Sequence, residues 1–172
     1  MKKVLLVVIA LFFVQFSFAQ KLTVYIVRHA EKDMSNTTLK DPELSFEGKQ
    51  RALELNRILK GKGINDIFST NYIRTRNTAG PLRDYRGLPL HLYDATKPAD
   101  LVKTIKTEYD GKTLLIVGHS NTVLELIEAF GGKKPFEEIP ETVYDNLFKL
   151  TINGDKISVS TSKYGKKSIE EN

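Results

Sequence analysis

The chain contains no cysteine in its 172 residues. This absence excludes a disulfide framework, thiolate catalysis and a lipidated cysteine as a membrane anchor. Histidine is scarce, with three residues, so any imidazole chemistry depends on very few positions. A basic block is also missing, because the formal net charge of +5 is a mild excess spread along the chain. We therefore do not expect nucleic acid as a partner.

The first 19 residues have the pattern of a secretory signal peptide. Two lysines precede the apolar run 4–14, and small residues around Ala19 provide a cleavage site after that residue. A retained membrane anchor is the alternative, but Gln15 interrupts the run before the ~18 residues that a spanning helix needs. We expect an exported protein, periplasmic or secreted, without stable membrane association after cleavage.

The remaining chain has the length of one domain with a hydrophobic core. We expect this domain to cover residues 20–165, and the small and charged residues 166–172 to form a flexible tail. Segments typical of strands and of helices alternate along it. The predicted strands are 22–28, 64–69, 88–93 and 113–117. The predicted helices are one that follows Ser45 and stops at Gly61, and those over 72–85, 98–105 and 120–130.

This alternation predicts a three-layer α/β/α sandwich with a mostly parallel central sheet. Ser45 is the expected N-cap of the first helix, and Pro81 is expected to kink or shorten the second. Residues 146–152 and 156–160 flank Asn153-Gly154, a dipeptide that favours the type I′ turn. The domain should therefore end in an antiparallel hairpin.

Two of the three histidines follow apolar runs. Arg28-His29 ends one predicted strand and His119 follows another. Ligands of open α/β sheets bind beyond the carboxyl ends of the strands, so the two imidazoles can converge on one small molecule. Arg28, and Arg74 after a third strand, indicate that this molecule is an anion, most naturally a phosphate. As N-cap of the next helix, Ser120 would direct unpaired N–H groups toward it.

A single histidine at a strand end is more often a hydrogen-bonded structural residue than a catalyst. The combination with two arginines favours catalysis, since a neutral imidazole is a nucleophile near pH 7 and a guanidinium binds phosphate oxygens. His91 alternates with leucines on its strand and is interpreted as non-catalytic. The long polar stretch 31–43 is expected to border the site.

Four segments together resemble the histidine phosphatase superfamily, which includes phosphoglycerate mutases and small phosphohistidine phosphatases. Residues 28–32 (RHAEK) are similar to its RHG or RHA signature, and residues 44–48 (LSFEG) to the L-[ST]-x-x-G that opens the first helix. Residues 69–79 (STNYIRTRNTA) are similar to S-x-x-x-x-R-[AT]-x-x-T-A. Residues 117–121 (VGHSN) match the motif of the second histidine.

The resemblance implies that His29 is the nucleophile that becomes phosphohistidine. It implies a phosphate pocket of Arg28, Arg74 and His119, to which we add Ser120 and Asn121 as substrate-binding residues. Water would then hydrolyse the phosphohistidine, and neither a metal nor another cofactor is expected.

The general acid is left with two candidates. Larger members of the family place an acidic residue after the third strand, where this chain has Asp94 without the surrounding family sequence. Glu31, two residues beyond the nucleophile, is the other candidate. For a substrate with a good leaving group, neither acid would matter much.

The function indicated is a metal-independent phosphoric monoester hydrolase of the histidine acid phosphatase type, acting on a small phosphorylated substrate or a phosphoprotein. A phosphoglycerate mutase is the alternative within enzymes, but those mutases are longer and cytosolic. A non-catalytic module that binds phosphorylated ligands is the alternative outside enzymes, and the presence of both His29 and His119 counts against it.

Overall fold

The computed structural model describes residues 20–168, so the predicted signal segment 1–19 lies outside the described residues. Ten helices and strands follow one another within residues 20–168. They are β1 Leu22–Arg28, α1 Phe46–Leu59, β2 Asp66–Ser69, α2 Ile73–Arg86, β3 Leu90–Leu92, α3 Pro98–Glu108, β4 Thr113–Gly118, α4 Ser120–Ala129, β5 Asn146–Asn153 and β6 Lys156–Lys163.

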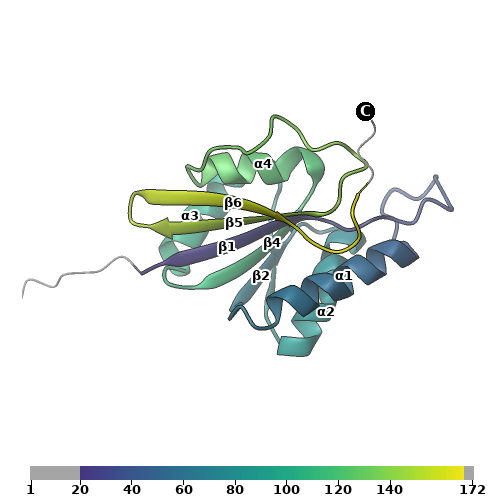
Figure 1. Cartoon of the computed structure of the whole chain (residues 1–172), viewed down its shortest axis with the longest axis horizontal. Helices are drawn as coiled ribbons and strands as arrows, with labels where there is room; N and C mark the ends of the chain where they lie inside the picture. Colours follow the sequence, from purple (N-terminus) through teal and green to yellow (C-terminus); the bar gives the residue numbers. More distant parts are fainter. Residues whose placement is uncertain (1–19, 169–172) are drawn as a thin grey trace, which may run out of the picture.

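The strands form one sheet in the order β3-β2-β4-β1-β5-β6 (Figure 1). The first four strands of the chain run parallel to one another, β5 pairs antiparallel with β1, and β6 pairs antiparallel with β5. The predicted mostly parallel sheet with a C-terminal antiparallel hairpin is confirmed.

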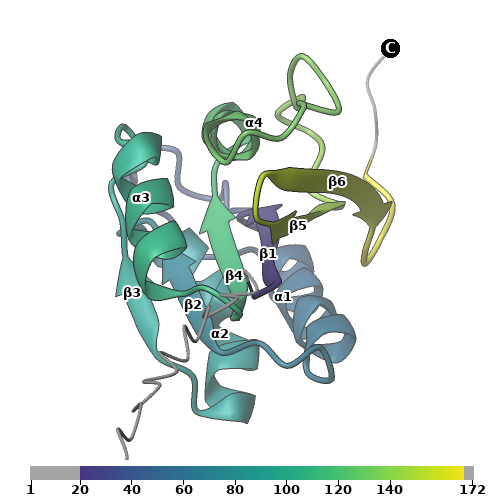
Figure 2. The same cartoon turned by 90° about the vertical axis from the view of Figure 1, so that its left-hand side faces the viewer.

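Helices cover both faces of the sheet, which confirms the predicted three layers (Figures 1 and 2). Strand β1 shows why, because Val24 and Ile26 pack with α3 and α4, whereas Tyr25 and Val27 pack with α1 and α2. All seven residues of β1 are buried. A strand buried on both faces has a continuous apolar sequence rather than an alternating one.

Helix α1 is tied at its start to the segment that follows β1. Ser45 is its N-cap, as predicted, and its hydroxyl accepts a hydrogen bond from the Gly48 N–H at 3.1 Å. The Ser45 N–H donates to the Glu31 carbonyl at 2.9 Å. The backbone of Gly48 lies so close to Glu31 that a Cβ on Gly48 would be 2.1 Å from that carbonyl oxygen.

Pro81 does not shorten α2, which continues to Arg86. Proline removes one hydrogen bond of the helix, but the fully buried side chains of Ala79 and Leu82 hold the chain against the sheet on both sides of it. The helix ends at Gly87, whose φ of 62° is the left-handed conformation that glycine adopts without strain.

The hairpin turn lies one residue later than predicted. Asn153 pairs with Lys156, so the central residues of the turn are Gly154 and Asp155. Gly154 has a φ of 57°, and no non-glycine residue within 20–168 has a positive φ. A positive φ at the first central position alone is the pattern of a type II′ turn. The type I′ prediction was wrong because Asn153 stays in the sheet.

The first part of the predicted tail makes contacts with the domain. Arg51 of α1 donates to the Lys166 carbonyl at 2.8 Å, and the Ser168 N–H donates to the Asp145 carboxylate at 3.0 Å. The rest of the predicted tail lies outside the described residues. In the part of the chain that the structure describes, no helix has the length and apolar character of a membrane span.

The contact between Gly48 and Glu31 gives a stability prediction. Gly48→Ala should lower the free energy of unfolding by about 1–3 kcal/mol, because the new methyl group forces the backbone of the two segments apart. It should also lower any activity that depends on His29, two residues before Glu31. Urea denaturation at equilibrium measures the stability.

Gly61→Ala is the matched control. Gly61 lies in the turn after helix α1, its φ is not positive, and a Cβ there would meet nothing within 4 Å. It should be neutral or stabilise the protein by up to about 1 kcal/mol, because alanine lowers the conformational entropy of the unfolded chain. Equal stability of the Gly48→Ala variant and the native protein would show that this contact does not constrain the fold.

Candidate active site

The two predicted histidines lie side by side at the carboxyl edge of the sheet. Arg28 pairs with Gly118 in the parallel register of β1 and β4, and the His29 N–H donates to the Gly118 carbonyl at 2.9 Å. The centroids of the His29 and His119 rings are 5.3 Å apart, with an angle of 68° between the ring planes. The structure therefore brings both imidazoles to one place.

A cavity of about 440 Å³ opens beside the two rings. Its wall is built from segments that follow β1, β3 and β4, from the start of α2 and from the connection between α4 and β5. The lining residues are His29, Lys32, Tyr72, Arg74, Ala95, Thr96, His119, Ser120, Asn121, Thr122 and Glu141.

His29 has the tautomer that a nucleophile requires. Its Nδ1 lies 2.7 Å from the Ala30 carbonyl oxygen, which can only accept, so Nδ1 carries the proton. The lone pair is then on Nε2. Burial, with the charges of Arg28 and Arg74, lowers the pKa of His29 to about 3, despite the opposing effect of that hydrogen bond. At pH 7 the ring is neutral.

His119 is neutral as well. Burial, followed by the charges of Arg74 and Arg28, lowers its pKa to about 4. Its Nε2 lies 2.9 Å from the hydroxyl of Thr70, and that hydroxyl donates to Thr75 Oγ1 at 3.0 Å. The Thr70 oxygen is therefore free to accept a hydrogen bond from the N–H at His119 Nε2.

Arg74 lies in the first turn of α2 and lines the cavity. Its Nη1 forms an ion pair with Asp41 at 3.2 Å, and its guanidinium carbon lies 4.3 Å from the centre of the Tyr72 ring. The Asp41 carboxylate also accepts the N–H of Ile73. Asp41 belongs to the long polar stretch 31–43, which therefore borders the site as expected. The Nε of Arg74 is buried without a hydrogen-bond partner.

Arg28 lies behind the cavity rather than on its wall. Its Nη1 donates to the carbonyls of Pro140, Glu141 and Val143 at 3.0 to 3.1 Å. Its Nη2 pairs with the Glu141 carboxylate, and its guanidinium lies 4.1 Å from the centre of the Tyr144 ring. The Nε of Arg28, like that of Arg74, is buried without a partner. Two unpaired donors of this kind favour an anionic ligand.

Ser120 and Asn121 line the cavity, but Ser120 is not the N-cap of α4. His119 holds that position, because its carbonyl accepts the N–H groups of Thr122 and Val123 at 3.0 Å. Helix α4 already begins at Ser120, directly after His119, so the histidine is the last residue before the helix and takes the cap position. The Ser120 hydroxyl donates to Glu141 instead.

Asp94 does not line the cavity, although its neighbours Ala95 and Thr96 do. Its Oδ1 accepts hydrogen bonds from the hydroxyl and the N–H of Thr96, at 2.7 and 2.9 Å. These bonds hold the pKa of the Asp94 carboxyl below its ordinary value. The side chain thus stabilises a turn and lacks a proton at neutral pH.

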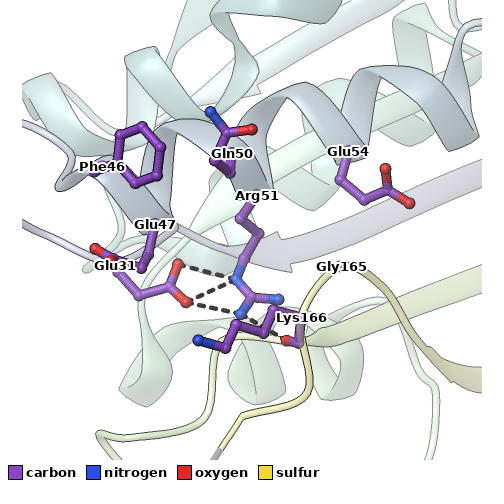
Figure 3. Close-up of a pocket in the computed structure, with 8 residues that line it drawn as sticks. All are labelled: Glu31, Phe46, Glu47, Gln50, Arg51, Glu54, Gly165 and Lys166. Atoms are coloured by element: carbon purple, nitrogen blue, oxygen red, sulfur yellow. Dashed lines mark hydrogen bonds and ion pairs between the residues drawn. The ribbon is translucent and has the colours of Figure 1, made fainter.

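Glu31 is directed toward helix α1 (Figure 3). Its carboxylate accepts three hydrogen bonds from the buried guanidinium of Arg51, at 2.7 to 3.0 Å. Arg51 also donates to the carbonyls of Tyr164 and Lys166. Glu31 lines two cavities on this side of the molecule and not the one with the histidines. Neither carboxylate considered as the general acid is therefore placed beside the two imidazoles.

Sequence reasoning missed two carboxylates at the site, Asp41 and Glu141. Both lie in connections without periodicity, so no pattern indicated them. It also gave no role to Thr78, whose hydroxyl accepts the Ala30 N–H at 2.9 Å and donates to the Arg74 carbonyl at 2.7 Å. Thr78 thereby joins the segment of His29 to α2. Its place in segment 69–79, which resembles a family motif, could have indicated this role.

His91 lies outside the cavity, and its Nε2 forms a hydrogen bond with the Asp66 carboxylate at 2.8 Å. Among residues 20–168, no group of three or more histidines and acidic residues is arranged to hold a metal ion.

Residues 24–97 match the family model of the histidine phosphatase superfamily, branch 1. This range contains the first histidine, the start of α1 and the arginine segment, whereas His119 lies beyond it. No curated protein matches the chain in sequence.

Solved structures share the fold at low sequence identity. YhfR of Bacillus stearothermophilus is 18% identical with a TM-score of 0.68, over 81% of this chain and 95% of its own. The protein histidine phosphatase SixA, solved with tungstate, is 15% identical with a TM-score of 0.66, over 82% and 96%. A phosphoserine phosphatase of Entamoeba histolytica, solved with phosphoserine, is 15% identical with a TM-score of 0.62, over 81% and 95%.

The depressed pKa values of the two histidines can be tested directly. Without ligand, the imidazole NMR signals of His29 and His119 should keep their neutral shifts from pH 8 down to about pH 5, because burial penalises the charged forms. The variants His29→Gln and His119→Gln assign the signals. A midpoint near the ordinary value of 6.5 for either ring would contradict the buried, arginine-flanked site.

Proposed function

Since the motifs, the family match and the fold agree in assigning this chain to the histidine phosphatase superfamily, we propose that it is a phosphatase that forms a phosphohistidine on His29. The proposal extends to phosphate monoesters, as small molecules or on a phosphoprotein, and to hydrolysis without a metal ion. It includes the classification as a phosphoric monoester hydrolase of the histidine acid phosphatase type.

One observation carries this proposal. A buried, neutral imidazole with a proton on Nδ1 presents its Nε2 lone pair beside two arginines whose Nε donors have no partner. A neutral nucleophile next to unpaired positive charge is the arrangement that transfer of a phosphoryl group needs.

The proposed reaction has two steps. His29 Nε2 attacks the phosphorus, and the bond to the leaving oxygen breaks. Arg74 and the amino-terminal end of α4 neutralise the non-bridging oxygens. His119 gains a partner for its imidazole, so a phosphate dianion would raise its pKa and favour its charged form. Water then attacks the phosphohistidine and restores His29.

The structural relatives support a phosphatase. Two of them are named as a protein histidine phosphatase and a phosphoserine phosphatase. The shared fold covers 96% and 95% of these two relatives' own chains. The cavity is bordered by Asn121, which is exposed, and by the largely exposed side chain of Glu141. An open site of this kind fits several phosphorylated groups, including one on a protein. Export of the protein, with cleavage after Ala19, is part of the same proposal.

Replacement of the nucleophile tests the chemistry. His29→Ala should lower kcat on p-nitrophenyl phosphate by ~10³-fold or more, because no other group forms the covalent intermediate. Substrate labelled with ³²P should give acid-labile, base-stable label on the native protein after rapid quenching, and none on the variant. His91→Gln is the control and should keep full activity. Activity of purified His29→Ala close to the native value would rule out this mechanism.

The role of Arg74 is tested separately. Arg74→Ala should lower kcat/KM by about 10²–10³-fold, because it removes a charged donor from the developing charge on the phosphoryl oxygens. The inhibition constant of vanadate should rise with it. Arg76→Ala is the matched control, since Arg76 lies in the same helix turn but outside the cavity. Equal effects of the two substitutions would remove Arg74 from the phosphate site.

A further inference from the structure

The Glu141 carboxylate occupies the position where an anion would bind. It accepts hydrogen bonds from Arg28 Nη2 and from the Ser120 hydroxyl, and it lines the cavity beside His29 and His119. Among the residues that line this cavity, Glu141 is the only one with a carboxylate. Its side chain is 74% exposed, so it lies toward solvent and has room to move.

We propose that Glu141 is the proton donor for the leaving group and, in the second step, the base that activates water. This inference rests on the phosphatase activity proposed above. It assigns the general acid to a residue in the connection between α4 and β5, a part of the chain in which sequence reasoning identified no candidate.

Geometry favours this position over the other two carboxylates. The leaving oxygen lies opposite the attacking His29 Nε2, and therefore toward the open side of the cavity. Glu141 lines this cavity and its side chain is largely exposed, whereas the other two carboxylates do not line it. Glu31 is held by Arg51 on the other side of the segment, and Asp94 is held in its turn by Thr96.

Substrate binding would release Glu141. A phosphate group that bonds to Arg28 and to the start of α4 competes for the same two donors that now hold the carboxylate. The connection that carries Glu141 is itself held to Arg28 by three carbonyl groups, so the backbone keeps the displaced side chain beside the cavity.

Displacement of the Glu141 carboxylate by phosphate should also change the protonation state of Glu141, because the groups around it set its pKa. Burial raises the pKa of Glu141, but the Ser120 hydrogen bond and the Arg28 charge outweigh this effect and hold it below its ordinary value. Lys32 acts in the same direction. The two cavities that Glu141 lines also contain other titratable groups: His29, Tyr72, Arg74 and His119 in the first, and Glu31, Glu47, Arg51, Tyr144, Lys166 and Lys167 in the second.

A phosphate dianion that binds to the Ser120 hydroxyl and to Arg28 removes the two main causes of the low pKa of Glu141. It also places a negative charge near the Glu141 carboxylate. Both changes favour the protonated carboxyl. Glu141 therefore gains a proton as the substrate binds, at the moment when a donor is required.

The proton balance closes over one cycle. In the first step the P–N bond to His29 forms, the P–O bond to the leaving group breaks, and the Glu141 proton moves to that oxygen to give an alcohol. In the second step the Glu141 carboxylate takes a proton from water, the water oxygen bonds to phosphorus, and the P–N bond breaks. Glu141 is then protonated again, and it releases this proton to solvent when inorganic phosphate leaves and the carboxylate returns to Arg28 and Ser120.

The test compares two substrates that differ in their need for an acid. Glu141→Gln should lower kcat on glycerol 3-phosphate by about 10²-fold or more, since an alkoxide is a poor leaving group. It should lower kcat on p-nitrophenyl phosphate by less than about 5-fold, because nitrophenolate leaves without a proton. Glu138→Gln, exposed in the same connection, is the matched control and should change neither rate.

The pH profile gives a second measure. The native enzyme should lose kcat on glycerol 3-phosphate at alkaline pH as Glu141 loses its proton, and Glu141→Gln should lack this decline. Glu141→Asp should recover part of the rate on glycerol 3-phosphate, because it keeps a carboxyl group.

Three results would overturn the assignment. They are an equal loss on both substrates, no loss on glycerol 3-phosphate, or an alkaline decline that persists in Glu141→Gln. Failure of the proposed function looks different, since the native protein would then hydrolyse neither substrate and leave no label on His29.

Discussion

The parallel pairing of β1 with β4 is the constraint on which the site depends. It places Arg28 opposite Gly118, so the next residue on each strand is a histidine at the same height of the sheet. The hydrogen bond from the His29 N–H to the Gly118 carbonyl extends the ladder by one step. A shift of the register by one residue would turn one of the two side chains to the other face of the sheet. The hydrophobic core on both faces therefore also maintains the geometry of the imidazoles.

The buried charge of the site is balanced in two different ways. Arg74 is paired with Asp41 and stacked on Tyr72, whereas Arg28 is surrounded by three carbonyls, Glu141 and Tyr144. A buried guanidinium without such partners would destabilise the fold. The Nε–H of each of these two arginines has no hydrogen-bond partner. The fold therefore stabilises both cations and leaves one donor on each for a ligand. Burial keeps both histidines neutral, and the positive charge of the two arginines adds to this effect, so the arginines contribute to anion binding and to the neutral state of the nucleophile.

Much of the fold could be predicted from the sequence, because strands buried on both faces and amphipathic helices leave strong periodic signals. His29, Arg74 and His119 were also accessible, since strand ends mark the edge of the sheet where ligands bind. Glu141 was not, because its contact with Arg28 joins residues more than one hundred positions apart, through a connection with no pattern. Asp94 was misleading for the opposite reason. The position of Asp94 after β3 is suitable for a general acid. Its carboxylate instead accepts hydrogen bonds from Thr96 within a turn, and local hydrogen bonds of this kind are common for Asp in turns.

The segment 140–144 shows how a site can be completed by residues that no motif contains. Its carbonyls approach Arg28 because the chain must cross the carboxyl edge of the sheet to pass from α4 to β5. Antiparallel pairing of β5 with β1 requires that crossing, since β5 starts at the edge where β1 ends. The hairpin at the C-terminus is thus more than an extension of the sheet. Because β5 runs antiparallel to β1, the connection that precedes β5 lies at the edge of the sheet where His29 is found. The topology of the sheet therefore places the Glu141 carboxylate beside the cavity.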